Sequence, residues 1–326
     1  MTSSLREAVR QAVRVLTGAG IDSAEADAVA LAAYALRTTT SEVHKLMILG
    51  AHAPDGLADL VAERARRVPL QHLTGTAGFR RLELSVGPGV FVPRFETEFV
   101  AGLAIAFLRE PRDGAAGTGA DLGTVQNTVP RFEVGSPAQS LGLRGGGPTQ
   151  SLGLSVPVVV DLCTGSGAIA LAIKDEVPAA DVHAVELSDL AHSWAIRNRD
   201  DLGLDVDIRL GDATLAFPDL EMGVDVVVSN PPYIPVGAVP NDPEVRDHDP
   251  EVALYGGSSD GLRIPLEVAA RAAVLLRPGG FFVMEHADVQ GDSLPAALRA
   301  TGLWRDIQDH ADLNGRPRAV TAVRAD

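Results

Sequence analysis

Residues 158–170 read VVVDLCTGSGAIA, an apolar run followed by a glycine-rich turn and an alanine-rich segment. The apolar β-formers predict a buried strand, and the segment after Gly167 predicts the start of a helix. Glycines in such a turn let the backbone approach a ligand closely, and the helix N-terminus adds exposed N–H groups. This stretch therefore predicts the first strand–turn–helix unit of an α/β fold with a ligand-binding turn.

Strands and helices alternate along the rest of the C-terminal half, which is typical of a parallel sheet. At the end, Asn314-Gly315 separates two β-type segments (304–310 and 319–323) and predicts an antiparallel hairpin. We therefore expect a Rossmann-like, mostly parallel seven-stranded sheet with a terminal antiparallel hairpin. The other strands are expected at 157–161, 182–186, 206–210, 224–228 and 280–285, and the helices at 167–176, 189–202 and 262–276.

The N-terminal part has a different pattern. Leu5, Val9, Val13 and Leu16 recur at helical spacing, and Ser23 can cap a second helix. Further helices are expected at 41–49 and 56–67, and alternation beyond Pro69 predicts a β-hairpin over 79–92. The expected domains are a small all-helical one (1–75), a hairpin linker (76–100) and the α/β domain (101–326). Substrate docking and simple packing both remain open as roles of the helices.

Residues 111–150 contain nine glycines and four prolines, with the repeat QSLGL at 139–143 and 150–154. The stretch has neither helical nor strand periodicity, so we expect a flexible insertion over about 111–155. A lid over a binding site is the alternative.

Composition excludes several classes of protein. A net charge of −15 and a pI near 4.9 argue against stable binding to nucleic acid, whose phosphates need basic surfaces. The single cysteine, Cys163, excludes an internal disulfide and a cysteine-based zinc site, and no metal is expected. The N-terminus lacks the apolar core of a signal peptide, and no apolar run is long enough to span a bilayer. We therefore expect a cytoplasmic protein; the sequence does not indicate its oligomeric state.

Residues 230–233, NPPY, follow the strand expected at 224–228. Two prolines stiffen this loop, which presents the Asn230 amide, the Pro231 carbonyl and the Tyr233 ring. Two acceptors and an aromatic face are what gripping a planar NH2 group requires. A proline-rich turn without further function is the alternative.

The glycine turn by itself is ambiguous. Its G-x-G-x-x-A pattern, with Glu186 about 20 residues further on, also fits a dinucleotide-binding fingerprint, and a purely structural turn remains open. Glu186 can accept both hydroxyls of a ribose, and Asp212 can hold an adenine amino group or cap a helix. These residues and Asn230 all follow strands, so they should converge at one edge of the sheet. An NH2-gripping loop there favours a methyltransferase acting on amino groups over a hydride-transferring enzyme.

With these motifs in place, the sequence resembles the HemK/PrmC-type glutamine methyltransferases over nearly the whole chain except the insertion. The resemblance implies a class I S-adenosylmethionine-dependent methyltransferase fold, and N5-methylation of a glutamine in a peptide chain release factor. The matching stretches are RVPLQHLTG (67–75), VPRFETE (92–98), DLCTGSG (161–167), SNPPYIP (229–235), HDPEVALYGG (248–257) and NGRPR (314–318).

The resemblance also implies the site residues. Methyl transfer would use Asn230, Pro231 and Tyr233, with Pro232 and Arg94 completing the substrate site. Some residues depart from the usual family pattern: His72, Phe95, Cys163, Ala213 and Ala287. The cofactor site would comprise Thr97, Asp161, Cys163, Thr164, Gly165, Ser166, Gly167, Glu186, Asp212, Ala213 and Asn230.

The expected mechanism is positioning of the acceptor amide by the Asn230 oxygen and the Pro231 carbonyl, with Tyr233 packed on the amide plane and no tuned general base. His248 and His286 could accept a proton, but structural roles are expected for both. The alternatives are methylation of a ribosomal protein's glutamine, methylation of adenine in nucleic acid, and a binding-only protein without turnover.

Overall fold

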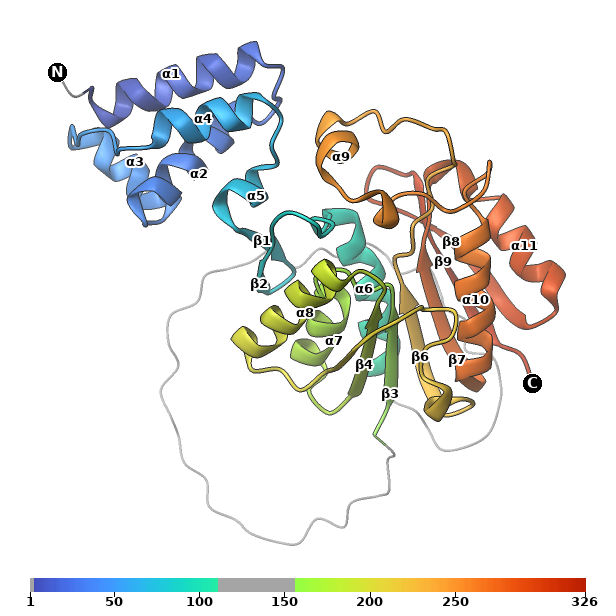
Figure 1. Ribbon diagram of the computed structural model, residues 1–326. Helices are drawn as coiled ribbons and strands as arrows, with labels where there is room; N and C mark the ends of the chain where they lie inside the picture. Colours follow the sequence, from blue (N-terminus) through green and yellow to red (C-terminus); the bar gives the residue numbers. More distant parts are fainter. Residues whose placement is uncertain (1–2, 111–155) are drawn as a thin grey trace, which may run out of the picture. The chain divides into compact units, whose positions relative to one another are not determined.

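The computed structural model describes residues 3–110 and 156–326, and Figure 1 shows them coloured along the chain. The insertion expected at about 111–155 lies outside these residues.

The N-terminal residues form a bundle of short helices around an aliphatic core. Leu5, Leu16, Leu31 and Val43 are fully buried there. Ser4 and Thr39 accept hydrogen bonds from Glu7 N and Glu42 N and so cap two of the helices. The helices are α1 (Leu5–Gly18), α2 (Ala24–Leu36), α3 (Thr40–Ile48), α4 (Leu57–Ala65) and α5 (Leu70–Thr74).

Two details of this bundle differ from expectation. Helix α5 was not expected, because five residues are too short to display a helical period. Ser23 occupies the N-cap position of α2 but makes no side-chain cap bond; its hydroxyl donates to Asp27 Oδ1 at 2.8 Å. That carboxylate also pairs with Arg64, so Ser23 stabilises a buried ion pair instead of the helix end.

A short antiparallel hairpin follows the bundle, with β1 (Thr76–Phe79) and β2 (Leu82–Ser85). The prediction of a hairpin over 79–92 was wrong in position. The turn is the dipeptide Arg80-Arg81, with Arg80 at φ 54°, so no glycine or asparagine signal revealed it. The alternation of apolar and polar residues at 82–86 correctly indicated a strand, β2, but this strand pairs with β1, which precedes it in the sequence.

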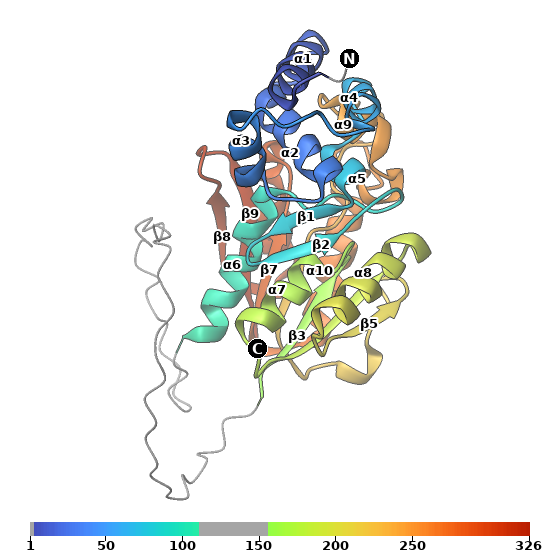
Figure 2. The same cartoon turned by 90° about the vertical axis from the view of Figure 1, so that its left-hand side faces the viewer.

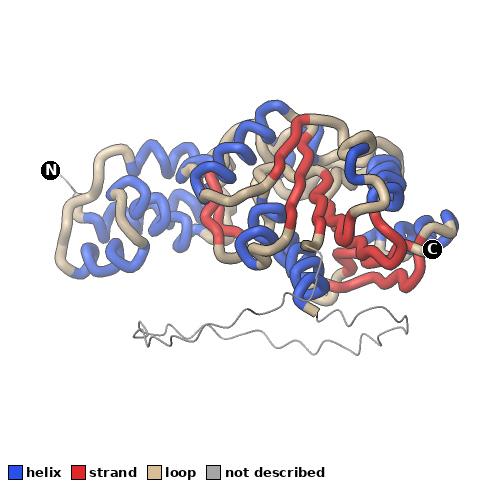
Figure 3. Tube along the Cα trace, turned by 90° about the horizontal axis from the view of Figure 1, so that it is seen from below, coloured by secondary structure: helices blue, strands red, loops and turns tan. Residues whose placement is uncertain are grey.

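The α/β part contains a seven-stranded sheet in the order β5-β4-β3-β6-β7-β9-β8. The first five of these strands run parallel, while β9 pairs antiparallel with β7 and β8. The expected fold class, including the terminal hairpin, is confirmed (Figures 1 and 3). The strands are β3 (Val158–Leu162), β4 (Asp181–Glu186), β5 (Asp207–Leu210), β6 (Val224–Ser229), β7 (Leu276–Glu285), β8 (Trp304–Ala311) and β9 (Pro317–Arg324).

Helices cover both faces of this sheet and bury two aliphatic layers. Helix α6 (Phe95–Arg109) contacts α7 and β7, and contributes Val100 and Ile105 to one layer (Figure 2). Helix α10 contributes Val268 and Leu275 to the other. The remaining helical elements are α7 (Ala168–Glu176), α8 (Asp189–Leu202), η1 (Pro218–Leu220), α9 (Pro243–His248), η2 (Glu251–Ala253), α10 (Arg263–Leu275), η3 (Asp288–Gln290) and α11 (Ser293–Thr301).

The sheet has its topological switch point between β3 and β6, because the chain builds outwards from β3 on one side and from β6 on the other. Leu162 is aligned with Ser229, so the turn after β3 and the loop after β6 begin side by side. Open α/β sheets bind ligands in the crevice beyond such a point.

Prediction for the helical bundle: Arg64→Ala should lower the free energy of unfolding by about 3–5 kcal/mol, because it leaves the Asp27 carboxylate buried without its cation. Arg64 and Asp27 are both 5% exposed and 2.7 Å apart. Urea unfolding followed by circular dichroism measures the loss. Arg14→Ala is the matched control, since the Arg14–Glu7 pair is 60% and 55% exposed and should contribute no more than about 1 kcal/mol. Equal losses in the two variants would contradict the prediction.

Candidate functional site

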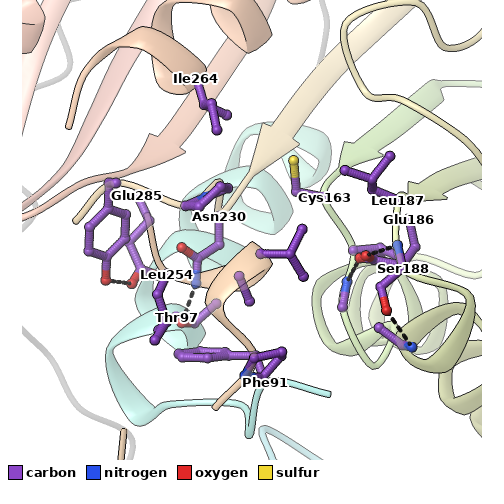
Figure 4. Close-up of a pocket in the computed structure, with 18 of the residues that line it drawn as sticks. Phe91, Thr97, Cys163, Glu186, Leu187, Ser188, Asn230, Leu254, Ile264 and Glu285 are labelled. Atoms are coloured by element: carbon purple, nitrogen blue, oxygen red, sulfur yellow. Dashed lines mark hydrogen bonds between the residues drawn. The ribbon is translucent and has the colours of Figure 1, made fainter. Parts of the chain in front are cut away.

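A cavity of about 770 Å³ lies beyond the carboxyl ends of the parallel strands. The turns after β3, β4, β5 and β6 all contribute to its lining, together with Glu285 at the end of β7 and Thr97 on α6 (Figure 4). The expected convergence of the motif residues is therefore observed. Those that line the cavity are Arg94, Thr97, Cys163, Thr164, Gly165, Ser166, Glu186, Asp212, Ala213, Asn230, Pro232 and Tyr233.

The glycine turn presents backbone to the cavity. Gly165 has φ 60°, and a Cβ there would meet no atom within 4 Å, so the space in front of it is open. Gly167 has φ 86°, a backbone conformation that residues with a side chain rarely adopt, and a Cβ there would also lie 2.9 Å from Leu171 Cδ1 of α7. Gly165 therefore lines the open cavity, while Gly167 lies outside the cavity lining.

Cys163 adopts φ 70°, in the left-handed region that favours glycine. This explains physically why a glycine is usual at this position of the family pattern. The thiol is partly buried beside the cavity, and burial raises its pKa. Cys163 is therefore a poor nucleophile at neutral pH.

Asp161 supports the turn from behind and does not line the cavity. It is fully buried, and its Oδ2 accepts hydrogen bonds from Thr164 Oγ1 (2.6 Å) and Ala170 N (3.2 Å). Its Oδ1 is buried without a hydrogen-bond partner in the described structure, and desolvation raises the pKa of the carboxyl to about 7. Asp161 thereby ties the turn to the first residues of α7.

Glu186 ends β4 at the cavity wall. Its two oxygens accept hydrogen bonds from Gly165 N and Ser188 N, each at 2.8 Å (Figure 4). Each carboxylate oxygen has a second lone pair, so the group can still accept two ligand hydroxyls. Desolvation raises its pKa, although its backbone donors oppose the shift.

Asp212 follows β5 and lines the cavity. Its Oδ1 accepts from Thr214 N and from Thr214 Oγ1, both at 2.8 Å, which is an Asx turn and not a helix cap, because residues 213–215 form a turn and no helix begins there.

The Asn230 loop is held rigidly from several sides. Asn230 Nδ2 donates to Thr97 Oγ1 at 3.2 Å, and the Tyr233 hydroxyl donates to Glu285 Oε1 at 3.1 Å. Gln290 Nε2 donates to the Tyr233 carbonyl at 3.0 Å, while a Cβ on Gly261 would lie only 2.1 Å from that carbonyl oxygen. Pro231 is buried and lies outside the cavity lining, unlike its neighbours Asn230 and Pro232.

Glu285 and Arg318 line the cavity but were not expected from the sequence. Glu285 is 2% exposed, its Oε2 has no hydrogen-bond partner in the described structure, and burial raises its pKa to about 7. The position of Glu285 at the end of an apolar strand, like that of Glu186, was the signal that could have identified it. Arg318 lies in the NGRPR stretch, which marked the family but not the site.

Arg94 and His286 make their polar interactions with other groups of the protein. Arg94 lines the cavity, but its guanidinium pairs with the buried Asp249 at 2.8 Å and lies over the Phe91 ring. His286 is fully buried, and both of its ring nitrogens are engaged at 2.8 Å, by Ala287 O and Asp309 Oδ1. These contacts agree with the structural role expected for His286.

Two kinds of feature are absent from the described residues. No group of three or more His, Cys, Asp and Glu side chains is arranged to hold a metal ion. No helix in residues 3–110 and 156–326 has both the length and the hydropathy that crossing a membrane requires.

Prediction for the buried carboxyls: the free energy of unfolding should fall as the pH rises from about 5 to about 8. Asp161 and Glu285 have folded-state pKa values of about 7, above their ordinary values of 3.8 and 4.5. Between those values the folded protein binds more protons than the unfolded chain, so raising the pH favours unfolding.

Asp161→Asn removes one of these two carboxyls and should make the free energy of unfolding depend less on pH. Each unit of pKa difference between the folded and unfolded states contributes about 1.4 kcal/mol. Urea unfolding at a series of pH values measures this. Parallel stability curves for the wild type and the variant would show that Asp161 does not titrate in this range.

Comparisons with known proteins agree with this geometry. The family model of the PrmC N-terminal domain matches residues 7–75, and that of the methyltransferase small domain matches residues 153–240. A release factor glutamine methyltransferase of Streptomyces coelicolor is 45% identical, over 97% of each chain. One of Mycolicibacterium smegmatis is 40% identical, over 98% of each. A 4-amino-L-phenylalanine/4-methylamino-L-phenylalanine methyltransferase of Streptomyces pristinaespiralis is 36% identical, over 98% of this chain and 95% of its own. The chain belongs to the release factor glutamine methyltransferase family.

Proposed function

We propose that this protein transfers the methyl group of S-adenosylmethionine to the side-chain nitrogen N5 of a glutamine in a translation release factor. The observation that carries the proposal is the meeting of the glycine turn, Glu186 and the Asn230 loop in one cavity. The family and the names of its relatives support the same reaction. Because release factors act on translating ribosomes, the cytoplasmic location expected from the sequence is part of this proposal.

The residues present fit the proposed cofactor. Gly165 has open space in front of it, and the oxygens of Glu186 retain lone pairs for two ribose hydroxyls. Asp212 and Ala213 line the part of the cavity assigned to the adenine. A volume of about 770 Å³ lies within the usual range of ligand cavities and leaves room for a substrate side chain beside the cofactor.

In the proposed reaction the protein mainly positions the acceptor. Bound S-adenosylmethionine supplies a methyl group that its positively charged sulfur has already activated. Of the two acceptors expected from the sequence, Asn230 lines the cavity and Pro231 does not. The Asn230 side-chain oxygen therefore accepts a hydrogen of the glutamine amide and directs its nitrogen at the methyl carbon. This acceptor also stabilises the positive charge that develops on that nitrogen.

The electron balance of the step needs no oxidant or reductant. The nitrogen–carbon bond forms as the carbon–sulfur bond breaks, and the electron pair of the broken bond stays on sulfur. The methylated amide nitrogen then loses one proton. With both ring nitrogens of His286 engaged, we assign that histidine no part in the proton transfer.

The proposed partner is a release factor, and we propose that residues 1–75 dock it. The match to the PrmC N-terminal domain over residues 7–75 supports this role. We also propose the domain limits expected from the sequence: a helical domain over 1–75, a hairpin linker over 76–100 and the methyltransferase domain over 101–326.

Prediction for the cofactor site: Glu186→Ala should weaken binding of S-adenosylhomocysteine by about 1.5–3 kcal/mol, the usual contribution of hydrogen bonds to a charged group. Isothermal titration calorimetry measures this, and NAD should show no comparable binding. Glu267→Ala is the matched control, because Glu267 lines the same cavity but pairs with Arg263 on its own helix. Unchanged affinity in Glu186→Ala would remove Glu186 from the cofactor site.

Prediction for the reaction: labelled S-adenosylmethionine should methylate a release factor, and peptide mass spectrometry should locate the methyl group on a glutamine. Asn230→Ala should reduce single-turnover transfer by about 100- to 1000-fold, the usual effect of losing one preorganised electrostatic partner, and should weaken cofactor binding far less.

A ribosomal protein, adenine-containing DNA and 4-amino-L-phenylalanine should be tested beside the release factor. The last compound is included because one relative in the comparisons is named for it. Preferential methylation of any of these three would replace the proposed substrate. Wild-type transfer by Asn230→Ala would overturn the role of the loop.

A further inference from the structure

Two buried side-chain amides lie behind the loops that line the cavity. Asn198 on α8 and Gln290 in η3 are 1% and 2% exposed, and both lie outside the cavity lining. Within the described part of the chain, each amide makes three hydrogen bonds, and every partner is a backbone group. Each amide therefore fastens one segment of main chain to another.

Asn198 connects the glycine turn to the β1–β2 hairpin. Its Oδ1 accepts from Ser85 N at 2.7 Å, and its Nδ2 donates to Ser85 O at 3.0 Å. The same Nδ2 donates to Ser166 O, a carbonyl of the glycine turn, at 2.9 Å. Ser166 lines the cavity but is only 2% exposed, so water has little access to this carbonyl if the bond is lost. Asn198 therefore fixes the glycine turn to the end of β2.

Gln290 has the equivalent place behind the Asn230 loop. Its Nε2 donates to Tyr233 O at 3.0 Å and to Asp260 O at 2.9 Å. Its Oε1 accepts from Ala287 N at 3.0 Å. Gln290 therefore fixes the loop after β6 to the segments that precede α10 and follow β7.

Hydrogen bonding fixes the orientation of both amides. In each, the oxygen faces one backbone N–H and the nitrogen faces two carbonyls. A flipped amide would place its oxygen against two carbonyl oxygens and its NH2 group against an N–H donor, and would lose all three bonds. Each fastening therefore depends on an NH2 group, which an aliphatic side chain or a carboxylate does not supply.

We propose that Asn198 and Gln290 are positioning residues with separate roles: Asn198 shapes the glycine turn for the cofactor, and Gln290 holds the Asn230 loop for the acceptor amide. This inference rests on the proposed function, because that function assigns a ligand to each loop. A buried carbonyl that loses its donor regains a hydrogen bond only when its loop moves, and the ligand must reverse that movement. Two structural fasteners that add only stability are the competing interpretation.

The first test replaces Asn198 by an aliphatic side chain of similar size. Asn198→Leu should weaken S-adenosylhomocysteine binding by about 10- to 100-fold, because the bound turn leaves Ser166 O buried without a donor. At saturating S-adenosylmethionine, its single-turnover transfer to a release factor should stay within about threefold of the wild type. Calorimetry measures the affinity, and rapid quenching of the labelled reaction measures the transfer.

Gln290→Met should show the reverse pattern. Its affinity for S-adenosylhomocysteine should stay within about threefold of the wild type. Its single-turnover transfer should fall by about 10- to 100-fold, because the acceptor loop is no longer held in the productive position. A general loss of stability does not produce this crossed result, since it affects both measurements of a variant alike. The proposal is overturned if Asn198→Leu keeps the wild-type affinity, or if each variant loses affinity and rate together.

Asp225→Asn is the matched control for altering a buried polar group. Asp225 lies near the start of β6, where it binds Arg277 and Val158 N, outside the cavity lining. This variant should lose stability but keep both the affinity and the transfer rate. A second pair, Asn198→Asp and Gln290→Glu, keeps the size and one acceptor oxygen while removing the NH2 group, and should repeat the crossed pattern. If Asp225→Asn shows the same losses as these variants, stability explains them and the proposal is wrong.

The last test uses the wild-type protein alone. The Ser85 N–H donates to Asn198 Oδ1, and Ser85 lies outside the cavity lining. If the Asn198 bonds stabilise the cofactor-bound turn, the cofactor must stabilise those bonds by the same free energy. S-adenosylhomocysteine should therefore slow amide hydrogen exchange at Ser85 by about tenfold or more, measured by NMR. Unchanged exchange in a protein that binds the cofactor would overturn the role of Asn198. A wild-type protein that binds no cofactor would instead refute the proposed function, so the two failures are distinguishable.

Discussion

The parallel pairing of β3 with β6 is the constraint on which the site depends. Leu162 is aligned with Ser229, and the Ser229 hydroxyl donates to the Leu162 carbonyl, so Cys163 and Asn230 both start their loops at the same edge. All six residues of β6 are buried, which leaves little freedom for the strand to slip. Because these two loops contribute the glycine turn and the Asn230 amide, a different register would separate the proposed cofactor site from the proposed acceptor site.

Buried carboxyl groups are the second characteristic of this region. Asp161, Glu186 and Glu285 lie in or behind the cavity, and burial raises the pKa of each. Raised pKa values mean that the ionised forms are destabilised relative to water. A positively charged ligand in the cavity would stabilise these ionised forms. The proposed cofactor carries such a charge, and the protein gives up some stability at neutral pH to present these groups.

Much of the sheet could be predicted because its strands are short apolar runs bounded by clear turns. The stretches at 158–162, 181–186 and 224–229 were placed to within one residue, since burial on both faces makes the β-formers continuous there. The β1–β2 hairpin was misplaced because its turn, Arg80-Arg81, contains none of the residues that usually mark one. Helix α5, with five residues, was too short to show a period.

The sequence by itself determined the fold class and the strand-end turns that contribute to the cavity, because glycine turns and strand-end polar residues are local signals. It did not separate Asp161 and Gly167, which support the glycine turn, from Gly165 and Glu186, which line the cavity. That distinction depends on the position of α7, which contacts the turn on the side of Asp161 and Gly167 and leaves Gly165 and Glu186 at the cavity. Only the tertiary structure brought Thr97 to Asn230 and Glu285 to Tyr233. The partners in each pair lie far apart in the chain, and their contacts follow from strand order, register and the packing of α6, none of which a local pattern encodes.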